Sequence, residues 1–563
     1  MASLVLATGA FAQTGPDSNP LEDPEATDEE RKVLQPIQVT GYHIKRIDLE
    51  GPAPVVVFDR EDLVSAGINT LEEFARYLPI NKPEPPLRFN TVGAAVFDLR
   101  GIGVDTTLTL INGMRVAPYA QSAENYIDVN SIPVSAIERI EILKDGASAI
   151  YGADAIAGVV NIILRQGFDG LEVSAGYGIS EEGDGEEMMA DLVTGMDSGR
   201  GGFMFSLSWY DREAQAMRDR DWSADADFSA VGGPNRRHPF SSPPSIWPMS
   251  GWVTVPDPEC GTDPLVTSVG DGPFGPEWGS GCRFNFAQFQ DQFWAFERIG
   301  ASLSGHYEIS GKLSLFGDLI YSDSTAEARQ APPAIPAPVG GFTLAGGPYV
   351  PPWHPANPFN DDLEVYSRML DGGPRVHTNE SEAWRAVAGL EGAWGDWDWR
   401  LSALFSENEV TKTYRNLPSQ SRYQDALLGM GGPGGNQFFN PFGYEPQNAP
   451  DLVDWILADA GLRDSSEERS VDLWLSRLFG ALPGGPVGVA AGLQYREQAL
   501  DQWAEESLLY GDLGHFHDPV SADRDILSAY VEFRLPLWNS LEAQLALRYE
   551  DYSDFGSTTN PKI

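Results

Sequence analysis

The sequence predicts a mixed α/β domain followed by an antiparallel transmembrane β-barrel, and three observations support this prediction. Between residues 97 and 165, short β-type runs alternate with glycine-bearing turns, which is typical of a compact mixed domain. From residue 171 onward, apolar and polar residues alternate with a period of two. The connections between these later runs are alternately short and long, which is typical of membrane barrels.

Size and charge narrow the function. A chain of 563 residues is too long for one ordinary domain. It carries 38 Lys and Arg residues against 82 Asp and Glu residues, a net charge of −44, which argues against nucleic acid or anionic lipid as a partner. No run of about 18 apolar residues occurs, so helical membrane spans are not expected.

The N-terminus predicts export. Residues 1–12 form an apolar run with an Ala10-Phe11-Ala12 cleavage pattern but no preceding basic residue, which indicates a partial signal peptide. Residues 13–33 are strongly acidic and predict a disordered leader.

The mixed domain contains four sequence elements in a fixed order: an RG pair, LINGxRV, IPxxAIERIEILKDGASAIYG and GVVNIIL. Together they resemble the plug domain of TonB-dependent outer-membrane receptors. The resemblance implies a plug domain at residues 45–165 and a barrel at residues 171–563. It also implies that the protein is no enzyme and needs no cofactor.

Residues 34–41 interrupt the acidic leader with a short β-prone segment. Its position resembles that of the TonB box, which in this family pairs as an added strand with the C-terminal domain of TonB, energised indirectly by ExbB and ExbD. The first strand of the plug is the alternative. The predicted TonB-binding residues are Gln35, Pro36, Ile37, Gln38, Val39 and Thr40.

Local signals predict the first plug elements. Residues 54–58 predict an apolar strand, and the acidic residues 59–62 open a helix. Asn69 or Thr70 caps a second helix at residues 71–78, with Glu73 placed for a capping box. This helix should stop before Pro79.

Five charged side chains lie among β-branched plug residues and are expected to bind one another or acidic residues of the barrel lumen. They are Arg100, Glu138, Arg139, Glu141 and Lys144. Loops around four further residues are candidates for ligand contact, with ordinary plug surface as the alternative. These residues are Phe89, Asn90, Tyr119 and Tyr126.

Connection lengths separate a membrane barrel from a soluble sandwich. Tight turns are predicted at 310–311, 395–396, 483–486 and 538–540, and long connections near 212–292, 326–379, 413–467 and 500–522. A barrel has tight periplasmic turns and long outer loops, whereas a sandwich has no reason for this asymmetry. Four tryptophans beside the tight turns suggest an aromatic girdle, with core packing as the alternative: Trp394, Trp397, Trp399 and Trp538.

The pattern predicts roughly eleven strands after the plug, against about 22 in the family's barrels. The last residues, RYEDYSDFGSTTNPKI, resemble the family's mid-barrel hairpin. The chain is therefore expected to be a fragment or the product of a truncated gene, and an adjacent reading frame continuing the barrel would support a split gene.

The two cysteines, Cys260 and Cys282, lie in one Gly/Pro/Asp-rich loop, where an oxidising compartment favours a disulfide; free thiols are the alternative. His515 and His517 are the best metal candidates, but incidental histidines in a loop are the better interpretation, and no metal site is predicted. No catalytic motif occurs.

The leading hypothesis is TonB-dependent active uptake of a scarce small-molecule ligand, such as a siderophore or oligosaccharide, across the bacterial outer membrane. The resemblance places the plug and N-terminus on the periplasmic side and the barrel in lipid. The alternative is a surface signalling or adhesion receptor on the same scaffold. The ligand remains open among siderophore, oligosaccharide, cobalamin-like compound and peptide.

Overall fold

The computed structural model describes residues 44, 55–82, 92–121, 125–251, 253–273, 275–335, 348–444, 448–514 and 517–563. The predicted signal peptide, acidic leader and TonB box lie outside these residues. Phe89, Asn90 and His515 also lie outside them.

The N-terminal part is a small mixed domain around a four-stranded sheet with strand order β1-β3-β4-β2. Strand β3 pairs antiparallel with β1 and β4, and β2 pairs parallel with β4. Its elements are β1 (Val55–Asp59), α1 (Arg60–Ser65), α2 (Leu71–Tyr77), η1 (Val104–Thr106), β2 (Thr107–Ile111), η2 (Val129–Ser131), η3 (Val134–Ala136), β3 (Ile137–Leu143), α3 (Ser148–Tyr151) and β4 (Gly158–Leu164).

Side-chain caps set the starts of the first two helices, and the sequence predicted the second of these caps. Asp59 caps α1, and its carboxylate accepts a hydrogen bond from the amide of Asp62. Thr70 caps α2 and forms a capping box with Glu73. Helix α2 ends at Tyr77, one residue earlier than predicted, because Leu78 already has extended backbone before Pro79.

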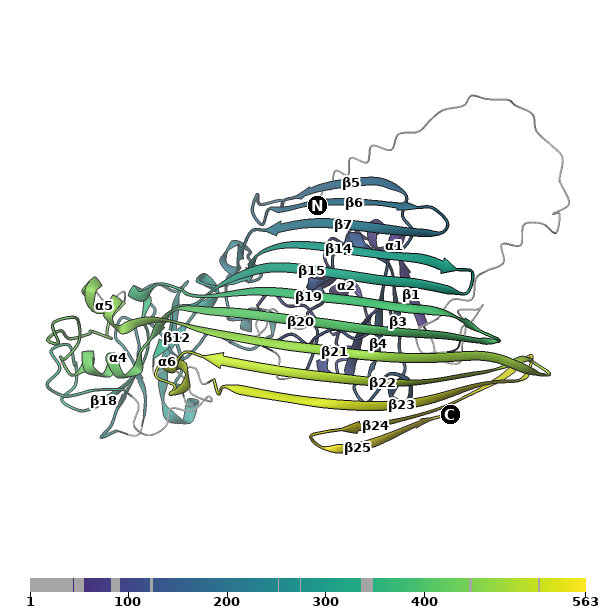
Figure 1. The fold of residues 1–563 in the computed structure, drawn as a ribbon. Coiled ribbons are helices and arrows are strands. Elements are labelled where there is room, and N and C mark those ends of the chain that lie inside the picture. Colours follow the sequence, from purple (N-terminus) through teal and green to yellow (C-terminus); the bar gives the residue numbers. More distant parts are fainter. Residues whose placement is uncertain are drawn as a thin grey trace, which may run out of the picture.

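The core of this domain continues into the large antiparallel sheet of the C-terminal part, which we call the wall. Phe74 is fully buried and makes edge-to-face contacts with Phe58 and Phe97, with ring centroids 5.2 and 6.1 Å apart. The same apolar cluster includes Met204 and Ile320 from the large sheet. The domain is therefore packed against the inner face of that sheet, as Figure 1 shows.

The C-terminal part is an antiparallel sheet of 12 strands, one more than the approximate prediction. Their order in the sheet follows the chain, with β5 and β25 at the two edges (Figure 1). The strands are β5 (Gly170–Gly178), β6 (Glu187–Asp197), β7 (Gly201–Arg212), β14 (Ala295–Ser310), β15 (Leu313–Gln330), β19 (Arg375–Trp394), β20 (Trp397–Pro418), β21 (Leu457–Leu482), β22 (Gly485–Ala504), β23 (Val520–Trp538), β24 (Leu541–Tyr552) and β25 (Gly556–Lys562).

Tight turns gather at one end of the sheet and long connections at the other. The predicted tight turns join β14 to β15, β19 to β20, β21 to β22 and β23 to β24. The long connections follow β7, β15, β20 and β22, as predicted. Trp394 and Trp538 flank two tight turns and are 81% and 59% exposed, so core packing does not account for them.

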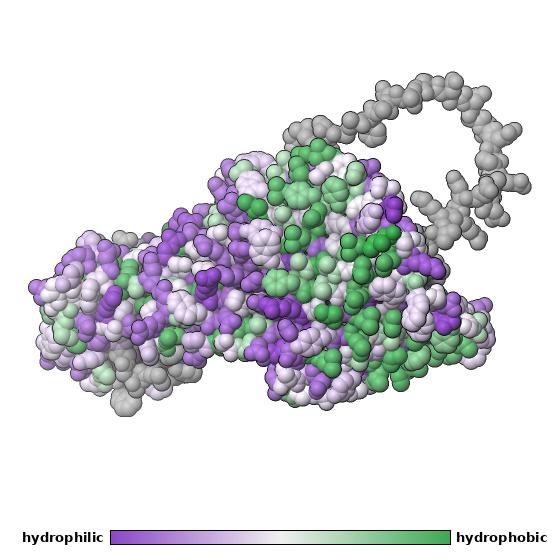
Figure 2. All heavy atoms as spheres, viewed as in Figure 1, coloured by the Kyte–Doolittle hydropathy of each residue, from purple (hydrophilic) through white to green (hydrophobic). Residues whose placement is uncertain are grey.

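The two faces of the large sheet have the opposite polarity to those of a soluble protein. Large apolar side chains such as Leu303, Phe405 and Leu527 are exposed on the outer face. Their chain neighbours on the inner face, including Ser406 and Ser528, are polar and buried. Figure 2 shows the outer apolar residues as a band across the strands, away from the more polar loop end. Such a surface is stable in lipid and unfavourable in water.

The long connections form a loop layer with its own apolar core, which includes Tyr423, Phe439 and Ile456. A disulfide joins Cys260 and Cys282 in this layer. Its elements are β8 (Gln215–Ala216), η4 (Met217–Asp219), η5 (Ser229–Val231), β9 (Ser245–Pro248), β10 (Val255–Pro256), β11 (Thr267–Asp271), η6 (Pro276–Trp278), β12 (Ser280–Phe284), η7 (Phe286–Gln288), β13 (Asp291–Phe293), β16 (Ala334–Ile335), β17 (Tyr349–Val350), β18 (Leu363–Arg368), η8 (Leu370–Gly372), α4 (Gln420–Leu427), α5 (Pro450–Ile456) and α6 (Glu506–Leu509).

Among the residues described, no helix has the length and apolar character needed to cross a bilayer.

Candidate functional site

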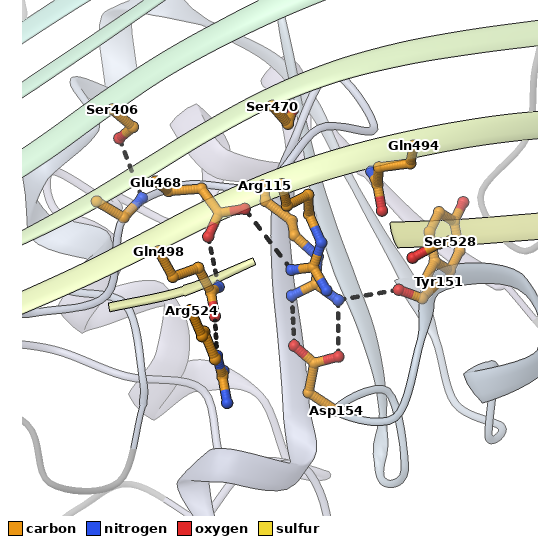
Figure 3. Close-up of polar contacts among 12 residues, drawn as sticks. Arg115, Tyr151, Asp154, Ser406, Glu468, Ser470, Gln494, Gln498, Arg524 and Ser528 are labelled. Atoms are coloured by element: carbon orange, nitrogen blue, oxygen red, sulfur yellow. Dashed lines mark hydrogen bonds and ion pairs between the residues drawn. The ribbon is translucent and has the colours of Figure 1, made fainter. Parts of the chain in front are cut away.

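The interface between the small domain and the wall is centred on Arg115, which follows β2. Its guanidinium forms a bidentate ion pair with Asp154, with Nη2 2.6 Å from Oδ1, and also donates to the carbonyl of Tyr151 at 2.9 Å (Figure 3). The side chains of Arg115 and Asp154 are 10% and 26% exposed, so this contact is buried on the Arg115 side and partly open on the Asp154 side.

Carboxylates of the wall add negative charge around Arg115 and favour its charged form. Burial alone would lower the pKa of Arg115, but Asp154, Glu468 and Glu550 raise it above its ordinary value. Burial would likewise raise the pKa of Asp154, but Arg115 and Arg496 hold it below its ordinary range. Both groups therefore remain charged at every physiological pH, and the interface is a permanent ionic contact.

Wall residues also bind the backbone of the small domain directly. Arg548 of β24 donates to the carbonyl of Ile150 at 3.1 Å and pairs with Glu550 at 3.0 Å. Glu550 accepts a hydrogen bond from the amide of Ala153 at 3.2 Å. The α3 turn is thus held by one cation and one anion of the same strand.

A second polar contact joins the turn after β2 to two neighbouring wall strands. Asn112 donates to Asp318 of β15 at 2.9 Å, and Arg385 of β19 pairs with the same carboxylate. Arg385 also donates to the carbonyl of Ile111 at 3.0 Å. Asp318 and Arg385 are both buried, so removing either side chain would leave the other charge buried without its partner.

A cleft of about 490 Å³ lies between the small domain and strands β21 to β23. Tyr119 and Asn125 line it from the small domain, and Ser466, Gln498 and Arg524 line it from the wall. Its size is in the range of ordinary small-molecule sites.

A line of polar contacts leads from this cleft to Arg115, as Figure 3 shows. Arg524 Nε donates to Gln498 at 2.6 Å, and the Gln498 amide donates to Glu468 at 2.5 Å. Glu468 in turn acts on the charge of Arg115. The cleft and the ionic contact are therefore parts of one connected polar network.

The predicted ligand residues that the structure describes lie in this region, but they are largely covered. Tyr119 and Tyr126 stack with ring centroids 5.8 Å apart and are 2% and 7% exposed. The Tyr119 hydroxyl accepts a hydrogen bond from Asn379 at 3.3 Å. Burial raises the pKa of Tyr119 well above its ordinary value.

Three of the five plug charges singled out in the sequence form one ion-pair cluster on β3. Arg139 pairs with Glu138 at 2.9 Å and with the buried Glu141 at 2.8 Å, all within β3. Arg100 donates to the carbonyl of Ala157, again inside the small domain. The half-buried Lys144 follows the end of β3.

Sequence reasoning missed Arg115, Asp154 and Glu468 as contact residues. Arg115 was visible as the arginine of the LINGxRV element, and Arg548 and Glu550 as the charged face of a period-two strand. Nothing in the sequence pairs these plug residues with their individual partners, which lie more than 300 residues away in the chain.

Of the two histidines considered as metal ligands, the structure describes only His517. His517 Nε2 lies 3.8 Å from a carboxylate oxygen of Asp464. Within the described part of the chain, no three His, Cys, Asp or Glu side chains are grouped to hold a metal ion.

Asp128 predicts a pH dependence of the small domain. Burial raises the pKa of its carboxyl to about 7, although Oδ1 accepts hydrogen bonds from the amides of Ala95 and Asn130. The folded domain binds this proton more tightly than the unfolded chain, so stability should be highest in acid and fall as the pH rises to about 7.

Hydrogen exchange, corrected for intrinsic rates, should show weaker protection of residues 92–97 at pH 7.5 than at pH 5. Asp128→Asn keeps the acceptor oxygen and should flatten the profile; an unchanged slope would exclude Asp128 as its source.

The architecture is a plugged sheet of membrane-barrel type, with an apolar outer face and a polar inner face. Residues 48–159 match the family model described as "TonB-dependent Receptor Plug Domain". The small domain is therefore a plug domain of the type found in TonB-dependent receptors, and the strands of the large sheet follow this plug in the chain.

Named relatives agree with this family. The vitamin B12 transporter BtuB of Vibrio cholerae is 31% identical over 152 residues, which are 26% of this chain and 24% of the relative. The ferric enterobactin receptor PfeA of Pseudomonas aeruginosa aligns with a TM-score of 0.50 at 14% identity, over 91% of this chain and 60% of that one. The ferripyoverdine receptor of the same organism gives 0.50 at 11% identity, over 91% and 53%. The chain thus spans little more than half of these solved receptors.

Proposed function

We propose that this chain takes part in TonB-dependent active uptake of a scarce small-molecule ligand across the outer membrane. The observation that carries the proposal is the plug, which is held by buried ionic contacts inside a sheet with an apolar outer face. The named relatives include a vitamin B12 transporter and siderophore receptors, which supports uptake as the activity.

In this mechanism, ligand enters from the long loops and reaches the cleft beside Tyr119. The contacts from Arg524 through Gln498 to Glu468 then link the occupied cleft to Arg115 of the plug. The TonB box becomes available to the C-terminal domain of TonB, and force from the energised ExbB/ExbD complex displaces the plug. Polar contacts between plug and wall suit this task, because water can form the hydrogen bonds that each group loses as the plug moves. An apolar interface would instead have to expose apolar surface to water.

The outer face suggests how the protein sits in lipid. Two outward aromatic side chains lie beside acidic residues at the loop-side end of the apolar band. Trp384 donates to Glu382 at 2.7 Å, and Tyr495 donates to Asp525 at 2.9 Å. Such amphipathic rings favour a membrane–water interface. We place the loop layer outside the cell and the tight turns, plug and N-terminus toward the periplasm.

Strands β5 and β25 each have one neighbour in the described sheet. Lipid cannot satisfy an open edge, so transport requires further strands that pair with both edges and close the wall. The chain is thus proposed to supply part of a full receptor.

The test of this function is binding to TonB. The chain should bind the purified C-terminal domain of TonB in a pull-down, and deletion of residues 35–40 should abolish that binding, because strand addition needs this backbone. Deletion of residues 26–31, an equally long piece of the acidic leader, is the matched control and should leave binding intact. Retained binding after the first deletion would refute the mechanism.

A further inference from the structure

We propose that His517 and Asp464 form a proton-dependent latch, which fastens part of the connection between β22 and β23 to the inner face of the wall more firmly at pH 5 than at pH 8. The fastened part is residues 505–514, which include α6 and which we call the strap. His517 follows the strap in the chain. The inference does not depend on the uptake function.

The strap packs against the inner face of the wall. Leu508 and Leu513 of the strap belong to one buried apolar cluster with residues of β20, β21 and β22, among them Ala504. Ala504 stands two positions after Gln502, and Gln502 donates to the carbonyl of Ala120 in the plug, so this face of β22 is the inner one. The strap therefore lies on the same side of the wall as the plug.

Polar contacts also hold the strap to its neighbours. Asp512 accepts hydrogen bonds from the Ser419 hydroxyl at 2.6 Å and from the amide of Ser421 at 2.9 Å, at the start of α4. The amide of Glu505 donates to the carbonyl of Gly461 at 3.1 Å. The donors in these contacts are hydroxyl and amide groups, which do not ionise near neutral pH. A pH dependence of the strap must therefore have another source.

Asp464 of β21 is a buried carboxylate in need of a donor. The residue is 0% exposed, and among the described residues neither of its carboxylate oxygens has a hydrogen-bond partner. His517 Nε2 lies 3.8 Å from Oδ1 of Asp464. Burying a carboxylate without a partner is costly. A shift of about 1 Å would turn this approach into a charge-assisted hydrogen bond, whose usual length is about 2.7–2.9 Å.

Other ionisable groups also surround Asp464. Lys412 and Tyr414 of β20 and Tyr119 of the plug interact electrostatically with its carboxylate. Lys412 and Asp464 stand on adjacent wall strands, so the attraction between them acts within the wall. The attraction between His517 and Asp464 instead acts between the wall and the connection that contains the strap. The acidic residues of the strap and its C-terminal neighbour are Glu505, Glu506, Asp512 and Asp518.

Protonation of His517 changes the strength of this contact. An imidazole ordinarily gains its positive charge between pH 8 and pH 5. Protonated His517 gives Asp464 a cationic donor, and such hydrogen bonds are roughly twice as strong as those between neutral groups. The backbone of His517 is bound to the strap, because its amide donates to the carbonyl of Leu508 at 3.4 Å. The strap should therefore be held more firmly in acid.

The latch lies where the plug meets the wall. Val410 of β20 pairs with Asp464 across the two strands and packs in one buried cluster with Tyr119 of the plug. The acidity of the surroundings thus sets how firmly this part of the loop layer is held beside the plug.

Hydrogen exchange of residues 506–513, in the full chain in detergent and corrected for intrinsic rates, tests the latch. In wild type, protection should be about fivefold stronger at pH 5 than at pH 8, the difference expected between a charged and a neutral hydrogen bond. His517→Gln keeps a donor but cannot gain a charge, and should abolish the difference. The His517 side chain is 27% exposed, so this variant should fold normally.

Two further variants complete the experiment. Asp464→Asn removes the carboxylate charge and should also abolish the difference. His306→Gln is the matched control, because His306 lies near the tight-turn end of β14, and it should keep the difference.

Three results would overturn the latch: equal protection of residues 506–513 at the two pH values in wild type, stronger protection at pH 8, or a difference that survives His517→Gln or Asp464→Asn. The plug provides an internal reference, because the pH dependence predicted for residues 92–97 arises from Asp128 and should persist in His517→Gln. Loss of that dependence as well would show a global effect of the substitution and count against the latch.

Discussion

Replacing Arg115 with alanine is expected to weaken the packing of the plug against the wall by roughly 3 kcal/mol, the lower end of the cost of removing one partner from a buried charge pair, because the Asp154 side chain is partly exposed. Asp154 would lose its bidentate partner, and the carboxylates of Glu468 and Glu550 would lose a compensating cation. Hydrogen exchange of residues 148–154 measures the effect, because these amides lie on the turn that this contact holds.

The matched control is Arg469→Ala. Arg469 pairs with Glu467 on the outer face and is 54% exposed, so its removal should change stability by about 0–1 kcal/mol. Equal protection of residues 148–154 in wild type and Arg115→Ala would show that the ionic contact does not hold the plug.

Leu303→Arg is expected to cost roughly 2–4 kcal/mol of folding free energy in a bilayer, the range for a cation at the lipid-facing midplane of a barrel. Leu303 lies near the middle of the outward apolar residues of β14 and is 44% exposed. The change leaves inner packing untouched, so the effect should appear in lipid vesicles and shrink in a detergent that solvates charge.

Val231→Arg is the control for Leu303→Arg. Val231 is 82% exposed in the loop layer, where water should already surround it. Folding yield in vesicles should be normal for this variant. If both variants fold equally well in lipid, the outer face of the sheet is not the membrane surface.

The sequence predicted the plug and the wall through local signals. Thr70 with Glu73 predicted a helix start, and the period-two alternation with the tight turn at 538–540 predicted strands on both sides of that turn, which are β23 and β24. These features depend on neighbours in the chain, so they are visible without a fold.

The contacts between distant segments could not be predicted in this way. Arg115 meets Glu468 and Glu550 only because plug placement and strand register bring them together. The core of the loop layer was also missed, since Tyr423 and Phe439 lie in a glycine- and proline-rich stretch whose pattern indicates irregular loops. Tertiary packing determines both features.

The central claim, that a plug sits against the polar face of a lipid-facing sheet, is tested most directly by spin-label accessibility along residues 401–406 of β20 in a bilayer. The only two cysteines are joined to each other, so single introduced cysteines can be labelled selectively. Labels at Leu401 and Phe405 should be accessible to oxygen in lipid, whereas labels at Ser402 and Ser406 should be shielded from both oxygen and a water-soluble relaxation agent. Water accessibility at Leu401 and Phe405, or equal exposure of both faces, would contradict the account.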